Sequence, residues 1–588
     1  MKIFWRLLGF LRPYRGGVIV SFLLAATAMA MGVLLPFLVG RTIDEIRAGS
    51  ENLWPLALAI LGAGLVRLAF SVARRLVAGR VSLGVEYDLR NRMYSHLQSL
   101  ELAFFDGEQT GQLMSRATVD LQAVRFFLGY GLIFILQSLI AIAIAAVVMF
   151  VVNPGLAVVA LLPMPFVIWV AFRYGRLNRP ATQEVQQRIA ELTAEAEENI
   201  SGVRVVKAFA QEARQLGRFQ DRVQRLFVQS MVSTRLRAFY NPFIGFLPQL
   251  GLAAILFVGG HQAVQGDITI GEFVAFFGYV LMLTSPMRTL GIALGMAQRA
   301  VASGARVFEI LDREPAMHVP AGAPGLPAGS GRVEMQNVTF AYEEGAEPVL
   351  RDVSLAVEAG RTVAIVGGTG SGKTTLVSLL PRLYDVTDGS VTIDGADVRE
   401  VDLRALRGEI ALVSDEPFLF SATVRENVAY ARPEATDAEV ETAARRAGAH
   451  EFISELPEGY DTLVGERGLT LSGGQRQRVS IARALITNPR ILILDDATSS
   501  VDATTEAEIK RALRTLMEGR TTFVIAHRLS TISLADEIVV LDHGRIAARG
   551  THDELLESSD LYREIAEGGS TERHFLTRKP LEREVAGL

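Results

Sequence analysis

Cysteine is absent from this chain of 588 residues. The absence excludes disulfides, a thiol nucleophile and zinc or iron–sulfur sites with cysteine ligands, although it does not identify a compartment. A strong net charge is lacking as well, because 59 Lys and Arg nearly balance 64 Asp and Glu and leave a net charge of −5. Such a small imbalance argues against nucleic acid as a partner.

Charged residues are also scarce over long stretches, most of which lie before residue 290. From about residue 330 onward the composition is that of a soluble domain, and a mean hydropathy of +0.28 excludes a disordered protein. We therefore expect a membrane half followed by a globular half. The expected parts are a transmembrane domain (1–312), a Pro- and Gly-rich linker (313–332), a globular domain (333–573) and a C-terminal tail (574–588).

The N-terminal residues predict an interfacial helix followed by a first membrane span. Met1–Arg15 mixes basic and apolar residues as an interfacial helix does, and no small-residue cleavage pattern of a signal peptide follows it. Gly16–Gly40 is then free of charge. At about 1.5 Å per residue this run reaches about 37 Å, enough to cross a hydrocarbon core of about 30 Å.

Further apolar runs bring the expected number of spans to six. Phe126–Phe172 is too long for one span and is interrupted only by Asn153-Pro154, so it predicts two helices joined by a short turn. Leu53–Ala73 carries one charge, Arg67, which marks either a transport pathway or the end of the span. The remaining runs are Ala238–Gly266 and Phe273–Met287.

Lysine and arginine are concentrated on one side of these spans. They are abundant before Gly16 and in the segments 74–125 and 173–237, which read as helix-rich extensions of the spans. The loops 41–52, 153–154 and 267–272 contain few of them. By the positive-inside rule, both termini and the two long loops are expected in the cytoplasm.

A phosphate-binding loop follows a predicted strand in the second half. The strand Thr362–Val366 runs directly into GGTGSGKT, which matches the pattern G-x-x-x-x-G-K-[ST]. Its glycines let backbone N–H groups face nucleotide phosphates, and a helix N-terminus adds its dipole. Lys373 would contact the β- and γ-phosphates, and Thr374 would hold Mg²⁺. The expected nucleotide-binding residues of this loop are Gly367, Gly368, Thr369, Gly370, Ser371, Gly372, Lys373, Thr374 and Thr375.

A second element of the phosphate site is ILILDD, residues 491–496. Its four apolar residues predict a buried parallel strand. Asp495 at the C-terminal end of this strand lies where ligands bind in such sheets, and its carboxylate would hold Mg²⁺ through water.

Between these two elements lies LSGGQRQR, residues 471–478. LSGGQ is the signature of ATP-binding cassette (ABC) proteins, and nearly the whole chain resembles an ABC half-transporter of the exporter type. The resemblance implies an all-α six-helix transmembrane domain followed by an α/β P-loop nucleotide-binding domain. It further implies ATP and Mg²⁺ as cofactors, a multi-pass location in the cytoplasmic (inner) membrane, and ATP-driven export by alternating access.

Several residue roles are implied by the resemblance. Tyr342 matches the aromatic residue that stacks on adenine, and His527 matches the switch histidine. Segments near Arg116–Val124 and Val206–Glu212 resemble the two coupling helices of the cytoplasmic loops. The signature residues that grip the γ-phosphate of ATP held by the opposite nucleotide domain are Ser472, Gly473, Gly474 and Gln475.

Two positions depart from the family pattern. Asp496 stands where the family has the Glu that orients the attacking water, and its side chain is one methylene shorter. A misplacement of about 1 Å can lower a rate about 100-fold. Asp415 replaces the Gln that is expected to touch Mg²⁺ and the water. An additional carboxylate at that position would tend to repel the phosphates unless the metal or protonation compensates.

An intact signature beside a weakened own site resembles the degenerate-site subunit of a heterodimeric exporter. We therefore expect a second half-transporter as partner, with small hydrophobic, lipid or peptide cargo. The alternatives are a homodimer with slow hydrolysis through Asp496, a nucleotide-gated channel, and an importer with an exporter-like fold. The sixth span holds residues that suit either a pliable apolar cavity or helix packing, namely Phe276, Phe277, Tyr279, Met282 and Met287.

Overall fold

The computed structural model describes residues 2–320, 322–343, 345–468, 470–496, 503–526 and 529–568. The chain forms two compact units, which are described separately. The first comprises Met1–Gln98 and Thr110–Arg313, and the second comprises Ser99–Gln109 and Glu314–Leu588. The expected C-terminal tail and the expected switch histidine, His527, lie outside the described residues.

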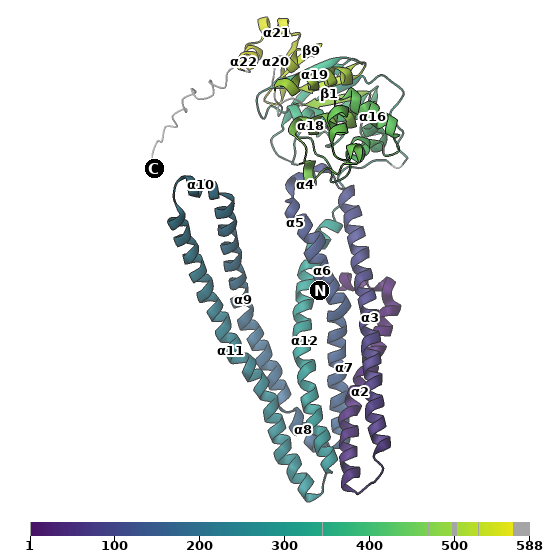
Figure 1. Cartoon of the computed structure of the whole chain (residues 1–588), viewed down its shortest axis with the longest axis vertical. Coiled ribbons are helices and arrows are strands. Elements are labelled where there is room, and N and C mark those ends of the chain that lie inside the picture. The colour runs from purple at the N-terminus through teal and green to yellow at the C-terminus, as the bar shows by residue number, and fades with distance from the viewer. Residues whose placement is uncertain are drawn as a thin grey trace. The chain divides into compact units, whose positions relative to one another are not determined.

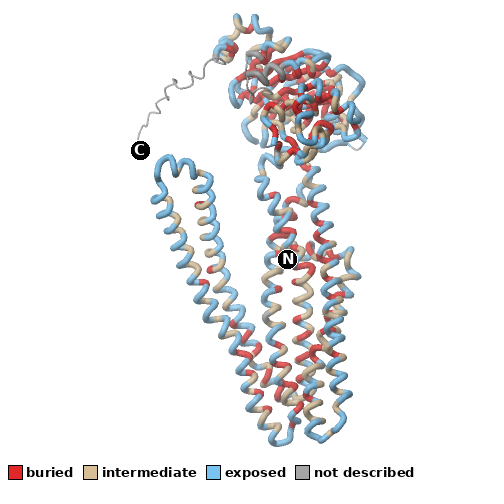
Figure 2. The backbone as a smooth tube through the Cα atoms, in the orientation of Figure 1, coloured by how far each residue is buried: buried red, intermediate tan, exposed pale blue. Residues whose placement is uncertain are grey.

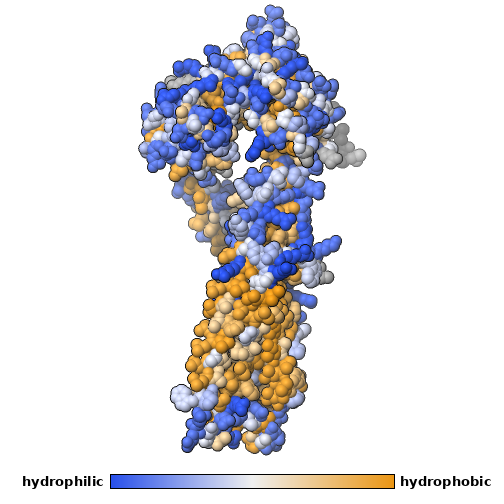
Figure 3. Space-filling model, turned by 90° about the vertical axis from the view of Figure 1, so that its right-hand side faces the viewer, coloured by the Kyte–Doolittle hydropathy of each residue, from blue (hydrophilic) through white to orange (hydrophobic). Residues whose placement is uncertain are grey.

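Among the described residues, six helical stretches are long and apolar enough to cross a membrane, as the sequence predicts. No more than 33% of the most apolar window of any stretch is buried, so most of these side chains need a lipid or protein environment. Figure 3 shows hydrophobic residues covering much of the surface of this unit. The stretches are Arg12–Arg47, Trp54–Ser99, Thr110–Val152, Pro154–Ser201, Glu212–Gln265 and Ile270–Leu311.

The helices of the first unit follow the chain with short breaks (Figure 1). Three single turns lie between them, the 3₁₀ turn η1 (Arg12–Tyr14) and the π-helical turns η2 (Arg116–Asp120) and η3 (Phe127–Gly131). The helices are α1 (Lys2–Gly9), α2 (Arg15–Arg47), α3 (Trp54–Ser99), α5 (Thr110–Ser115), α6 (Leu121–Phe126), α7 (Leu132–Val152), α8 (Pro154–Leu161), α9 (Pro163–Ser201), α10 (Val203–Ala208), α11 (Glu212–Gln265) and α12 (Ile270–Leu311).

The predicted turn at Asn153-Pro154 is confirmed. The side-chain oxygen of Asn153 accepts a hydrogen bond from the backbone N–H of Leu156 at 2.9 Å and so caps α8. Pro154 occupies the first position of α8, where its missing N–H costs no helical hydrogen bond. Two residues therefore suffice to reverse the chain between α7 and α8.

The helices α9 and α11 form a long hairpin that is closed by α10. They lie side by side and diverge from α2, α7 and α12 toward the end that carries α10 (Figure 1). That end of the hairpin is mostly exposed (Figure 2), and its large apolar side chains include Val203, Val205 and Phe209, which are 46%, 62% and 72% exposed. This unit by itself leaves the apolar tip of the hairpin uncovered.

The second unit contains two β-sheets. A four-stranded antiparallel sheet has the order β2-β1-β4-β5, and a six-stranded sheet has the order β10-β9-β3-β8-β7-β6. All pairs of the larger sheet are parallel except β10 with β9. The strands are β1 (Val333–Phe340), β2 (Leu350–Val357), β3 (Thr362–Gly367), β4 (Asp388–Ile393), β5 (Ala396–Asp397), β6 (Ile410–Val413), β7 (Ile491–Asp495), β8 (Thr521–Ile525), β9 (Glu537–Asp542) and β10 (Arg545–Gly550).

Helices enclose the parallel sheet, whose central strands β3 and β8 are buried at every residue. Burial on both faces explains why these strands are almost uninterrupted apolar runs. The helices are α4 (Leu102–Gly107), α13 (Lys373–Ser378), α14 (Leu403–Gly408), α15 (Val424–Val428), α16 (Asp437–Arg446), α17 (His450–Glu455), α18 (Gly473–Thr487), α19 (Ala503–Met517), α20 (Leu529–Ile532), α21 (His552–Ser558) and α22 (Asp560–Gly568), with 3₁₀ turns η4 (Ala429–Ala431), η5 (Gly459–Asp461) and η6 (Glu466–Gly468).

The two segments that resemble coupling helices both lie in helical parts of the first unit. Arg116–Val124 falls within η2 and α6 of the first unit, whereas Ser99–Gln109, which contains α4, packs in the second unit. The second expected segment, Val206–Glu212, overlaps α10 and the start of α11 at the tip of the hairpin.

Candidate functional site

The phosphate loop connects β3 to α13, as the motif predicts. Gly370 and Gly372 have φ values of +80° and +100°, a backbone conformation that glycine adopts without steric cost. Gly372 also lies against Leu350, whose side chain would be only 2.8 Å from a Cβ atom at this position. The loop therefore depends on these two glycines for its shape, and α13 begins at Lys373 directly after it.

Lys373 is buried within the loop that it follows. Its ammonium group donates hydrogen bonds to the carbonyl oxygens of Gly367 and Gly368, each at 2.9 Å. Burial lowers the pKa of Lys373, while the carboxylates of Asp495 and Asp496 act in the opposite direction. The lysine thus lies within electrostatic reach of both aspartates, as one shared phosphate and metal site requires.

The loop retains hydrogen-bonding capacity that fits a phosphate group. The hydroxyl of Ser371 is buried and has no hydrogen-bond partner among the described residues, although a buried hydroxyl normally has one. Thr374 is exposed at the start of α13. The hydroxyls of Ser371 and Thr374, together with the ammonium group of Lys373, are hydrogen-bond donors that suit the phosphate oxygens of ATP.

Asp495 and Asp496 follow one another at the C-terminal end of β7. Asp495 is paired with Ile525 of β8, and the N–H of Asp496 donates to the carbonyl oxygen of Ile525 at 3.1 Å. Asp496 has a φ of +44°, which is uncommon for a residue with a side chain. The backbone at the expected catalytic position is therefore held against β8.

Magnesium fits this site only together with the nucleotide. Among the described residues, no group of three or more His, Asp or Glu side chains could hold a metal ion. Mg²⁺ prefers oxygen ligands and is commonly bound by one or two protein groups plus substrate phosphates. Thr374 and Asp495 match that arrangement, with ATP oxygens completing the ligand set.

Asp415 lies just beyond the C-terminal end of β6, the strand next to β7. The neighbouring Ser414 is tied to the signature helix, because Gln477 of α18 donates to its carbonyl oxygen at 3.3 Å. The carboxyl ends of parallel strands meet at one edge of a sheet. The fold therefore places Asp415 and Asp495 at the same edge.

The signature residues form the N-terminus of α18. The N–H of Gln475 donates to the hydroxyl of Ser472 at 3.3 Å, and the side-chain oxygen of Gln475 accepts from the N–H of Ser472 at 2.8 Å. This reciprocal pair is a capping box. Gly473 and Gly474 open the helix, and Ser472 is exposed. The signature thus has a local structural role and remains accessible from outside this chain.

Tyr342 contacts the residue that follows the phosphate loop motif, because its hydroxyl lies 2.8 Å from the hydroxyl of Thr375. The rings of Tyr342 and Tyr384 pack edge to face, with their centroids 5.3 Å apart. The hydroxyl of Tyr384 in turn donates to the carboxylate of Asp106 on α4. Burial, followed by this hydrogen bond, raises the pKa of Tyr384, which therefore stays neutral.

Sequence reasoning missed Tyr384 and Asp106. Asp106 belongs to the Lys- and Arg-rich segment 74–125, and nothing in that segment indicates a partner in the nucleotide-binding half. A second contact anchors the same segment, because Glu101 accepts a hydrogen bond from the N–H of Ala316 at 3.0 Å. Contacts between residues so far apart in the sequence cannot be predicted from local patterns, and only the folded structure reveals them.

Comparison with known proteins agrees with this geometry. Residues 18–287 match the family described as ABC transporter transmembrane region, and residues 350–499 match the family described as ABC transporter. An ATP-dependent lipid A-core flippase of Syntrophus aciditrophicus is 41% identical over 558 residues, which cover 95% of this chain and 92% of that protein. The chain belongs to the ABC exporters. This exporter is also 40% identical to a multidrug efflux ATP-binding/permease protein of Mycobacterium tuberculosis over 588 residues, 99% of this chain and 49% of that protein.

The fold of the exporter matches a solved structure as well. The structure of a bacterial Atm1-family ABC exporter with ATP bound is similar with a TM-score of 0.78 and 30% identity, covering 95% of this chain and 99% of the other. The exporter is therefore an ATP-binding, ATP-hydrolysing transporter with a six-helix transmembrane domain and an α/β nucleotide-binding domain. Its spanning helices and its bacterial relatives make it a multi-pass inner-membrane protein.

Proposed function

We propose that this exporter is one half of a heterodimer in which its own ATP site is impaired in hydrolysis. The observation that carries the proposal is Asp496 at the position of the catalytic base. Its N–H donates a hydrogen bond to Ile525 of β8, which holds the backbone of Asp496 in place while its side chain is one methylene shorter than Glu. A shortfall of about 1 Å corresponds to a loss of about 100-fold in rate.

Asp415 adds to the same impairment. Its carboxylate stands at the sheet edge where the phosphates and Asp495 meet, in place of a neutral amide. Like charges in a partly buried site repel one another strongly. We expect this site to hold ATP for long periods, while the partner's site, completed by Ser472–Gln475 of this chain, turns over.

The need for a partner subunit is supported by two surfaces. The tip of the α9–α11 hairpin exposes apolar residues of α10 and its flanks, including Val203, Val205 and Phe209. Apolar surface of this kind is commonly covered in an interface. The exposed Ser472 at the start of α18 is likewise available to a nucleotide held by another chain. Both surfaces suit a homodimer too, so Asp496 and Asp415 are what favour unlike subunits.

In the proposed mechanism, the chain's own residues bind and orient ATP. The loop N–H groups and Lys373 hold the phosphates, Tyr342 stacks on adenine, and Thr374 and Asp495 hold Mg²⁺, which would neutralise phosphate charge. Asp415 and Asp496 would flank the attacking water, and the resemblance implies that His527 would contact the γ-phosphate. ATP binding closes two nucleotide domains, and the long cytoplasmic helices transmit this closure to the membrane, with both termini in the cytoplasm.

The cargo we propose is a hydrophobic or amphipathic molecule, such as a drug, lipid or peptide. The names of the two relatives, a lipid A-core flippase and a multidrug efflux protein, support this class. The sixth span has fewer side chains available to cargo than its composition suggested, because Phe276 and Tyr279 are packed inside the helix bundle. Arg67 is exposed, and its guanidinium carbon would be 3.6 Å from a Cβ atom at Gly32.

Native mass spectrometry of the tagged exporter, extracted gently from the membranes of its own host, tests the heterodimer. A complex of two different half-transporter masses is the expected result. A mass of twice this chain would overturn the proposal. ATP turnover would then have to proceed through Asp496, and D496N would be expected to abolish it.

A further inference from the structure

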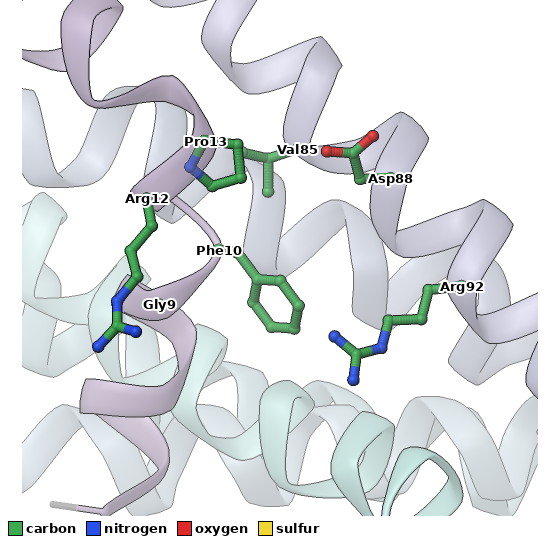
Figure 4. A pocket seen from close by; sticks show the side chains of 7 residues that line it. All are labelled: Gly9, Phe10, Arg12, Pro13, Val85, Asp88 and Arg92. Atoms are coloured by element: carbon green, nitrogen blue, oxygen red, sulfur yellow. The ribbon is translucent and has the colours of Figure 1, made fainter.

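A cavity of about 350 Å³ lies between the N-terminal helix α1 with its η1 turn and the cytoplasmic part of α3. Phe10, Pro13 and Val85 provide an apolar wall. Arg12, Arg92 and Asp88 provide charge (Figure 4), and Gly9 completes the lining. Ligand cavities generally combine such an apolar wall with a few convergent polar groups.

The lining carries an excess of positive charge. Arg12 and Arg92 are exposed, and Arg92 lies within electrostatic reach of Asp312, which is itself hydrogen-bonded to Arg6. The one acidic lining residue, Asp88, is already engaged, because its carboxylate accepts a hydrogen bond from Tyr14 at 2.9 Å. In the view of Figure 4, the ring of Phe10 lies between the two arginine side chains. The arrangement suits a ligand with an anionic head and an apolar part.

The cavity lies where the apolar surface of the bundle ends. The charge-free run of α2 begins at Gly16, and Gly17 packs against Val81 of α3, one helical turn before the cavity residue Val85. On α1, Trp5 is 67% exposed. Tryptophan is enriched at the level of lipid headgroups. In the proposed orientation the cavity therefore faces the headgroups of the cytoplasmic leaflet.

We propose that this cavity binds the headgroup of an anionic phospholipid. Basic pockets between helices on the cytoplasmic side are suited to anionic headgroups. Arg12 and Arg92 would contact the phosphate region, and the apolar wall would contact the glycerol backbone. The lining residues all belong to the first unit, whereas the phosphate loop belongs to the second, so the proposed occupant is a bound lipid distinct from the nucleotide.

Residues of α1 and of the cavity wall contact the end of α12. Arg6 of α1 donates to both carboxylate oxygens of Asp312, at 2.6 and 2.5 Å, and its guanidinium lies 3.8 Å from the ring centroid of Phe308. The cavity residue Phe10 stacks on the same ring, with centroids 6.0 Å apart. Arg6 foremost, with help from Arg92, lowers the pKa of Asp312. A lipid in the cavity would thus hold α1 against the last turn of α12.

The test uses the purified full-length exporter in nanodiscs of phosphatidylcholine with increasing fractions of phosphatidylglycerol. Lipid retention is read by native mass spectrometry and stability by thermal unfolding. The variant R12Q/R92Q should bind phosphatidylglycerol about 30-fold more weakly, because it removes both cationic groups that would contact the headgroup phosphate inside the cavity. It should also lose the thermal stabilisation that phosphatidylglycerol gives the parent protein. The charge-conserving variant R12K/R92K should retain most of the binding.

The matched control is R15Q/R80Q, which removes the same charge from α2 and α3 at exposed positions outside the cavity. It should bind phosphatidylglycerol as the parent does. Equal binding by R12Q/R92Q and R15Q/R80Q would overturn the proposal. Displacement of the lipid by inorganic phosphate or glycerol 1-phosphate would overturn it as well, because the cavity would then take a soluble phosphate.

Discussion

At the scale of single residues, the proposed impairment of this exporter's own ATP site depends on Asp496. Its amide is bonded to Ile525, so a longer side chain at this point would advance its carboxylate without moving the strand. We expect D496E to raise single-turnover hydrolysis at this site about 100-fold. Rapid-quench measurement of bound ATP, in a complex whose partner site is blocked, would show the change.

The control for this substitution is D496N, which keeps the size of the side chain and removes its charge. If the site is impaired, the single-turnover rate of ATP hydrolysis in D496N should differ little from that of the parent protein. A large loss of turnover in D496N, together with no gain in D496E, would mean that Asp496 already acts as an efficient base.

A second effect of single residues is the contact between Tyr384 and Asp106. Y384F keeps the ring that packs on Tyr342 and removes only the hydroxyl that donates to Asp106. We expect the affinity for ATP to stay unchanged and the stimulation of ATPase activity by cargo to fall, because α4 loses its link to the adenine side of the site. Combined with D106N, the coupling energy in a double-mutant cycle should be about 1 kcal/mol.

Y430F is a matched control in the same unit, since the Tyr430 hydroxyl forms no hydrogen bond to the described residues. It should leave stimulation by cargo intact. A weaker affinity for ATP in Y384F, measured with a fluorescent nucleotide, would instead place Tyr384 in support of the nucleotide site alone.

At the scale of elements, the sequence predicted features that depend on local chemistry. The predicted strand Thr362–Val366 matches β3 (Thr362–Gly367) to within one residue, and the Asn153-Pro154 turn is confirmed because its cap needs only four consecutive residues. The position of α4 was missed, because it depends on Tyr384, far away in the chain. The capping role of Ser472 and Gln475 also went unnoticed, although their spacing fits a capping box.

Close packing of α2 against α12 is another feature that becomes visible only in the structure. A Cβ atom at Gly271 would overlap the carbonyl oxygen of Gly40, and the N–H of Gly271 donates to Asp44 at 2.8 Å. We expect G271A to destabilise the transmembrane domain by roughly 1–3 kcal/mol, because the two helices must move apart. Thermal unfolding in detergent measures the loss.

The comparison for this prediction is G291A on the same helix. A Cβ atom there would meet no other atom within 4 Å, so α12 gains a better helix-forming residue without a clash. G291A should therefore leave the unfolding temperature unchanged or raise it slightly. Unfolding temperatures that fall equally in G271A and G291A would contradict the prediction, because the loss would then not depend on the contact between Gly271 and Gly40.

At the scale of the whole molecule, the chain enters the nucleotide-binding unit before its transmembrane unit is complete. Ser99–Gln109 is covalently continuous with α3 and with α5, yet it packs among residues of the second unit. The second unit is therefore joined to the spanning stretches Trp54–Ser99 and Thr110–Val152 by the backbone itself. This connection suits a pump in which ATP binding changes the arrangement of the spans.

Pumping itself is the last prediction. In inside-out vesicles that contain the exporter and its partner, ATP should drive accumulation of an amphipathic fluorescent solute above its external concentration. K373A in this chain should reduce accumulation strongly, because ATP held at its site keeps the nucleotide domains together even where hydrolysis is slow. K2A, which removes an exposed lysine, should not. Equilibration without accumulation would indicate a channel, and accumulation only in right-side-out vesicles an importer.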